Sequence, residues 1–197
     1  MHVGYVVVNN GANVIDISSE KLLYDQPIPL LDAFEIIKIL REEGVTFYVK
    51  QDFRSSVSGG SIQPFVGDKQ LQKAYMFHAN EQYSSEKVDK IFKKLSHISD
   101  LALHKTRHKL PDKYGININH AKATKLHGVE VVMKKLDLKR EYIVGVGDSY
   151  NDFPLLMACG FKVAMGNGIE ELKAIADYVA PSVSDDGVAE VINKFIL

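Results

Sequence analysis

The chain lacks the features that would place it in a membrane, on a nucleic acid or in an oxidising compartment. Its 197 residues include no tryptophan and one cysteine, Cys159, so an intrachain disulfide cannot form, which fits a reducing cytoplasm. The 24 lysine and arginine residues nearly balance 25 aspartate and glutamate residues, so no broad attraction to nucleic acid or anionic lipid is expected. No apolar run is long enough to cross a membrane, and no signal peptide is visible.

The carboxyl-terminal third shows a regular alternation of helix-like and strand-like segments. Runs of β-branched residues predict strands, and apolar residues spaced three and four apart predict helices. Such alternation is typical of a parallel sheet with right-handed crossovers. The predicted order is a helix around 129–136, a strand at 142–147, a helix at 152–158, a strand at 161–165, a helix at 169–176 and a last helix at 188–195.

The preceding part mixes strands, turns and helices less regularly. We expect a strand at 3–8, a hairpin around Ser18-Ser19, a helix ending near Gly44, a loop rich in serine and glycine at 52–70, and a helix capped by Ser84-Ser85. Further strand candidates are 45–49, 75–79, 101–106 and 114–119. The sequence therefore predicts an α/β protein in which 18–117 is an inserted α+β module, while 1–17 and 118–197 form parts of one Rossmann-like sheet.

Two carboxylates and an amide follow the strand at 142–147. Asp148 comes at its carboxyl end, where open α/β sheets bind their ligands, and Asn151 and Asp152 follow within one loop. Hard oxygen ligands grouped in this way suit Mg²⁺. Other readings stay open, because Asp148 or Asn151 could cap the next helix and Asp152 could simply favour its first turn.

The sequence of this region resembles that of a known family of enzymes. The segments GDSYND, CGFKVAMGN and SDDGVAEVI follow one another in the order and spacing of the haloacid dehalogenase-like phosphatases, most closely the Cof-type branch with a large cap. The resemblance implies a Rossmann-like core with an inserted α+β cap domain. It also implies Mg²⁺-dependent hydrolysis of a small phosphate ester, such as a sugar phosphate, through an aspartyl-phosphate.

The same resemblance implies roles for individual residues. Asp148 becomes a metal ligand, and Asp152 holds the metal directly or through water. Lys125, in HAKATKLHG, matches the lysine that offsets charge during phosphoryl transfer, although Lys122 competes for this assignment. Asn10 matches a turn that faces the active site in the family, so it is a candidate substrate contact, with a turn-only role as the alternative. Asn151 is a further candidate for binding water or phosphate.

One family feature is missing. The family carries its aspartate nucleophile in a DxDGT loop, and this chain contains no DxD. We read it as the carboxyl-terminal part of a phosphatase, inactive alone. The alternatives are a non-catalytic binding or regulatory module and a fragment of a P-type ATPase phosphorylation domain. If the chain is the carboxyl-terminal part of a phosphatase, the resemblance implies that two core strands are missing beside the strand at 142–147. The edge of that strand would then be open, and we expect it to pair with Val3–Val8, a second copy of the chain or a partner segment.

Overall fold

The computed structural model describes residues 4–52, 65, 67, 71–107 and 111–197. Most of the loop predicted at 52–70 therefore lies outside the described residues. The chain divides into two compact units, Met1–Ala123 and Thr124–Leu197, each described by itself below.

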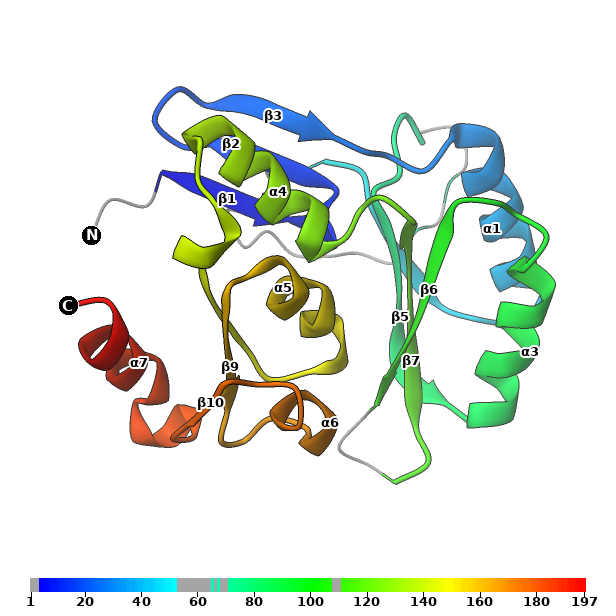
Figure 1. Cartoon of the computed structure of the whole chain (residues 1–197). Helices are drawn as coiled ribbons and strands as arrows, with labels where there is room; N and C mark the ends of the chain where they lie inside the picture. Colours follow the sequence, from blue (N-terminus) through cyan, green and yellow to red (C-terminus); the bar gives the residue numbers. More distant parts are fainter. Residues whose placement is uncertain (1–3, 53–64, 66, 68–70, 108–110) are drawn as a thin grey trace. The chain divides into compact units, whose positions relative to one another are not determined.

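The first unit begins with a three-stranded antiparallel sheet (Figure 1). Its strands are β1 (Tyr5–Val8), β2 (Asn13–Asp16) and β3 (Lys21–Asp25), in the order β1-β2-β3, with a short 3-10 turn η1 (Asn9–Gly11) between the first two. Asp16 stabilises the turn after β2, because its Oδ1 accepts hydrogen bonds from the backbone N–H of Ser18 at 2.9 Å and from the Ser18 hydroxyl at 2.6 Å. The hairpin predicted around Ser18-Ser19 is confirmed.

A second antiparallel sheet carries the main core of this unit. The strands β4 (Phe47–Lys50), β5 (Met76–Tyr83), β6 (Leu101–Arg107) and β7 (Tyr114–His120) pair in the order β4-β5-β7-β6. The helices α1 (Leu30–Glu42) and α3 (Ser85–Leu95) cover one face of this sheet, as Figure 1 shows. Because side chains alternate along a strand, Phe77, Ile116 and Ile118 point toward the helices and join their buried faces.

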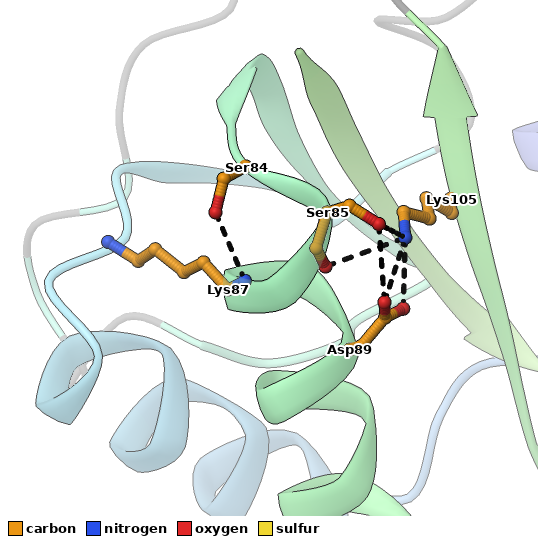
Figure 2. A network of polar contacts seen from close by, with 5 residues as sticks. All are labelled: Ser84, Ser85, Lys87, Asp89 and Lys105. Carbon is orange, nitrogen blue, oxygen red and sulfur yellow. Dashed lines mark hydrogen bonds and ion pairs between the residues drawn. The ribbon is translucent and has the colours of Figure 1, made fainter. Parts of the chain in front are cut away.

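Helix α3 begins directly after Ser84, as the predicted cap at Ser84-Ser85 implies. The Ser84 hydroxyl accepts a hydrogen bond from the backbone N–H of Lys87 at 3.3 Å, which satisfies one of the unpaired donors of the first turn. Lys105, on β6, forms hydrogen bonds to the first turn of α3 (Figure 2). Its ammonium donates to the Ser85 hydroxyl at 2.6 Å and to the Asp89 carboxylate at 2.9 Å. The helix is thus fixed to its sheet by polar contacts as well as by its apolar face.

The second unit is a small parallel α/β arrangement. Its strands β8 (Val144–Gly147), β9 (Phe161–Met165) and β10 (Tyr178–Ala180) form a parallel sheet in the order β10-β9-β8. This confirms the predicted alternation. The helical segments are α4 (Lys125–Leu136), η3 (Arg140–Tyr142), η4 (Tyr150–Asp152), α5 (Phe153–Ala158), α6 (Glu170–Lys173), η5 (Val183–Asp185) and α7 (Gly187–Phe195).

Among the described residues, β1 pairs with β2 in the first unit, and β8 pairs with β9 in the second. The division into a core at 1–17 and 118–197 with a cap at 18–117 stays a prediction. In the part of the chain that the structure describes, no helix is long and apolar enough to cross a membrane.

Candidate functional site

The loop after β8 is organised around the carboxylate of Asp152. This residue is buried, with 4% of its surface exposed. Its Oδ2 accepts the backbone N–H groups of Asp148 at 2.9 Å and Ser149 at 3.0 Å. Its Oδ1 accepts a hydrogen bond from the ammonium of Lys125, in the first turn of α4. Both oxygens of Asp152 are therefore engaged within the protein.

The local sequence explains why the loop takes this shape. Ser149 and Asp152 form a capping box, in which each side chain accepts the backbone N–H of the other. Gly147 allows the Asp152 side chain to lie close to the end of β8, since a Cβ at this position would lie 2.5 Å from the Cβ of Asp152. The short helix η4 is therefore capped by Ser149 and Asp152, and not by Asp148.

The two carboxylates have opposite electrostatic environments. Burial opposes the charge on Asp152, but the hydrogen bond from Lys125 and the backbone N–H groups outweigh it and lower the pKa of this carboxyl. Asp148 lies exposed at the end of β8. Its pKa is raised by partial desolvation and then by its hydrogen bond to Asp152 and the charge of that residue, against the opposing effect of Lys125. The loop therefore presents one anchored carboxylate and one that is accessible.

The structure brings together Lys125, Asp148 and Asp152 among the predicted site residues. Asn151 is exposed in the same loop. Lys122, the rival of Lys125, belongs to the first unit, where its backbone N–H donates to Nδ1 of His120 at 3.0 Å. The catalytic role of Lys125 and the metal-binding roles of the two aspartates stay predictions.

Asn10 lies in the first unit and is held by its neighbours there. Its Nδ2 donates to Oδ1 of Asn119 at 3.0 Å. The sequence patterns did not single out Asn119, which is fully buried on β7. A polar residue in the alternating segment YGININH is a weak signal. Its partner is 109 positions away, so no local pattern could have paired the two.

The residues of this loop fit part of a Mg²⁺ site. Asp148 supplies an accessible carboxylate oxygen, which is the hard ligand that Mg²⁺ prefers. Within the described residues, no three histidine, cysteine, aspartate or glutamate side chains gather into a metal-binding group. Because Mg²⁺ takes six oxygen ligands in near-octahedral geometry, the remaining ligands would be water, substrate phosphate or other carboxylates.

Comparison with known proteins places the chain in a family. The family model for haloacid dehalogenase-like hydrolases matches residues 1–192. The chain therefore belongs to the haloacid dehalogenase-like hydrolases, and the resemblance seen in its motifs is confirmed. A haloacid dehalogenase-like hydrolase from Bacillus subtilis has a similar structure, with a TM-score of 0.79 and 22% identity, over 98% of this chain and 79% of that chain. This likeness confirms the α/β fold.

Curated relatives match over shorter segments. Phosphoglycolate phosphatase 1 of Saccharolobus solfataricus is 42% identical over 83 residues, which are 42% of this chain and 36% of that protein. The 5-amino-6-(5-phospho-D-ribitylamino)uracil phosphatase YcsE of Bacillus subtilis is 34% identical over 82 residues, which are 42% of this chain and 33% of that protein. The matches thus span about a third of the length of these relatives.

Proposed function

We propose that the chain is the carboxyl-terminal part of a Mg²⁺-dependent phosphatase that hydrolyses small phosphorylated metabolites. The observation that carries this proposal is the arrangement of Lys125, Asp152 and Asp148 at the carboxyl end of β8. This arrangement places the Lys125 ammonium, held by Asp152, and the accessible Asp148 carboxylate at the end of the strand where α/β sheets bind ligands. Membership of the hydrolase family and the phosphatase names of the relatives support it. A cytoplasmic location is part of the proposal, resting on the single, unpaired Cys159.

Each residue of the candidate site has a distinct part in this proposal. Asp148 would hold the metal directly, and Asp152 would act on it through water, since both of its oxygens have protein partners. Bound Mg²⁺ supplies positive charge that stabilises the phosphoryl oxygens. The Lys125 ammonium offsets the charge that shifts between nucleophile and phosphoryl group, and Asp152 keeps it in place so that little reorganisation is needed. Asn151, exposed beside them, binds a water or a phosphate oxygen.

The nucleophile comes from outside this chain in this proposal. An aspartate of a DxD loop attacks phosphorus, the alcohol leaves, and water hydrolyses the aspartyl-phosphate. The chain contains no DxD, so it lacks this covalent route when it is alone. The same absence favours the second candidate function, a non-catalytic module of this fold that binds a phosphate ester or regulates a partner.

A phosphatase assay with and without the nucleophile separates the two candidates. The chain alone is expected not to hydrolyse p-nitrophenyl phosphate in the presence of Mg²⁺. A longer protein that carries a DxD segment before this sequence is expected to hydrolyse it and to lose the activity in Asp148→Asn and Lys125→Met. If the longer protein is inactive although it folds and binds Mg²⁺, the binding module is the better reading. Mg²⁺-dependent turnover by the chain alone would contradict the assignment of the nucleophile.

A further inference from the structure

The backbone of Asp148 is held by hydrogen bonds on both sides of its side chain. Its N–H donates to Oδ2 of Asp152 at 2.9 Å. Its carbonyl oxygen accepts the N–H of Ile169 at 3.0 Å, from the segment that follows β9. The first bond restricts φ of Asp148 and the second restricts ψ, because each fixes one of the two peptide planes that flank the residue. The exposed carboxylate of Asp148 can therefore change its direction only by rotation of the side chain.

Gly168 lets the segment after β9 approach the backbone of Asp148. The turn is closed by the N–H of Gly168, which donates to the carbonyl of Met165 at 2.8 Å. A Cβ at position 168 would lie 2.9 Å from that carbonyl oxygen, and 3.1 Å from both Cα and the carbonyl oxygen of Asp148. These are backbone atoms, which cannot rotate away as the end of a side chain can. The absence of a side chain at Gly168 thus brings the N–H of Ile169 within reach of Asp148.

A second contact joins the same two segments. The hydroxyl of Tyr150, in η4, donates to Oε1 of Glu171, in α6, at 2.8 Å. Ile169 is the residue at which α6 begins, so both contacts reach the start of this helix. The loop after β8 is therefore joined to the start of α6 at Asp148 and at Tyr150, and its position depends on that of the turn at 165–169.

We infer that Gly168 and Ile169 are positioning residues for Asp148, which they hold in the orientation that binds Mg²⁺. This inference rests on the proposed function, in which Asp148 is the metal ligand. Groups that orient a ligand contribute to metal affinity although they do not touch the ion. Mg²⁺ requires near-octahedral geometry, and a loop that already has its bound conformation loses less conformational entropy when the ion binds.

The first experiment tests the hydrogen bond without any metal. In the chain labelled with ¹⁵N and ¹³C, a scalar coupling across the hydrogen bond is expected between the amide nitrogen of Ile169 and the carbonyl carbon of Asp148. Such a coupling identifies the acceptor as well as the donor. Its absence would show that the two groups are not bonded in solution, and would overturn the inference.

The second experiment removes the donor. Ile169 has φ −70° and ψ 147°, which proline also adopts, so Ile169→Pro suits the local backbone but replaces the N–H with a ring carbon. Ile169→Ala is the matched variant, because it shortens the side chain and keeps the N–H. Gly168→Ala disturbs the same contact by crowding the backbone of Asp148. It decides the question if Ile169→Pro does not fold.

Mn²⁺ is the probe for metal binding, because it takes the same carboxylate and water ligands as Mg²⁺ and broadens the NMR signals of nearby groups. The broadening of the Asp148 and Ser149 amide signals during a titration gives the affinity. Ile169→Pro and Gly168→Ala are each expected to weaken Mn²⁺ binding about 10-fold. Ile169→Ala is expected to retain the affinity, since its N–H remains.

Gly145→Ala separates positioning from a general loss of stability. A Cβ at position 145 would lie 2.6 Å from Sγ of Cys159, so this substitution also crowds β8. It does not touch the turn at 165–169, and it is expected to lower the urea midpoint without weakening Mn²⁺ binding. Weakening of Mn²⁺ binding by Gly145→Ala as large as that by Gly168→Ala would show that stability alone sets the affinity, and would overturn the inference.

The remaining outcomes distinguish this inference from the proposed function. Wild-type affinity in folded Ile169→Pro or Gly168→Ala overturns the positioning role and leaves the metal site intact. Equal weakening by Ile169→Ala and Ile169→Pro shows that the side chain matters rather than the N–H, and also overturns it. If Mn²⁺ does not broaden the signals of 148–149 in the wild-type chain, or still does so in Asp148→Asn, the proposed metal site is itself wrong.

Discussion

The ammonium of Lys125 and the carboxylate of Asp152 form an ion pair that joins the start of α4 to the loop after β8. Asp152 is almost fully buried, whereas 30% of the Lys125 side chain is exposed. The pair leaves Asp148 as the accessible carboxylate of the loop. A single buried carboxylate thus fixes both a cation and a neighbouring metal-ligand candidate.

The first prediction removes the cation of this pair. Lys125→Met is expected to reduce the free energy of unfolding of the second unit by about 2 kcal/mol, because a charge-assisted hydrogen bond to a buried carboxylate is lost. It is also expected to raise the pKa of Asp152, since Lys125 is the main side chain that lowers it. Urea denaturation followed by circular dichroism measures the stability, and ¹³C chemical shifts of the carboxyl group measure the pKa.

Lys122→Met is the matched control for Lys125→Met. Lys122 is three positions away and belongs to the first unit. It is expected to change neither quantity measurably. Equal destabilisation by the two substitutions would show that the contact between Lys125 and Asp152 is of no special importance.

The second prediction concerns the close approach at Gly147. Gly147→Ala would place a Cβ 2.5 Å from the Cβ of Asp152 and 3.1 Å from Cδ1 of Leu156. We expect a loss of stability of about 1–3 kcal/mol, the usual range for overpacking, and altered amide shifts at Asp148 and Ser149. Gly4→Ala serves as the control, since a Cβ there meets nothing within 4 Å. A Gly147→Ala variant as stable as Gly4→Ala would argue against the tight loop.

The third prediction concerns metal affinity. Mg²⁺ is expected to bind this chain weakly, because Asp148 offers one accessible carboxylate and Asp152 is already occupied. With a single carboxylate from the chain, the ion keeps most of its water ligands, which Mg²⁺ gives up reluctantly. Isothermal titration calorimetry at neutral pH measures the affinity, and Asp148→Asn should abolish what binding there is. A micromolar affinity that survives Asp148→Asn would place the metal elsewhere.

The fourth prediction concerns the free edge of β8. The carbonyl of Ile143 accepts from the backbone N–H groups of Gly160 and Phe161 beside β9. Because backbone groups alternate along a strand, those of Val144 and Val146 point to the opposite side. We propose that this edge is covered by a second copy of the chain or by a partner segment, since an open apolar edge is prone to pair.

Hydrogen exchange and molar mass together test the coverage of this edge. The amides of Val144 and Val146 are expected to exchange slowly, like that of Val163 on the central strand β9. Light scattering after size exclusion then tells a dimer from a monomer. Fast exchange at Val144 and Val146 in a monomer would show that the edge is open in solution.

The sequence by itself determined the class of fold and predicted where the candidate site lies. Strand and helix periods are local properties, and they predicted β8, β9 and α7 because each is built from a continuous apolar run or a regular apolar spacing. The motif GDSYND is likewise contiguous, so its spacing alone is enough to group Asp148 with Asp152. The preference for Lys125 over Lys122 came from family resemblance rather than from any physical feature of the residues.

Only the tertiary structure decided which of these groups is held by hydrogen bonds and which is exposed. Asp152 is anchored, and Asp148 is accessible, because Lys125 and two backbone N–H groups from other positions converge on one carboxylate. Asn10 donates a hydrogen bond to Asn119, which lies 109 positions away. Hydrogen-bond direction and burial arise from contacts between distant segments, and such contacts leave no periodic trace in the sequence.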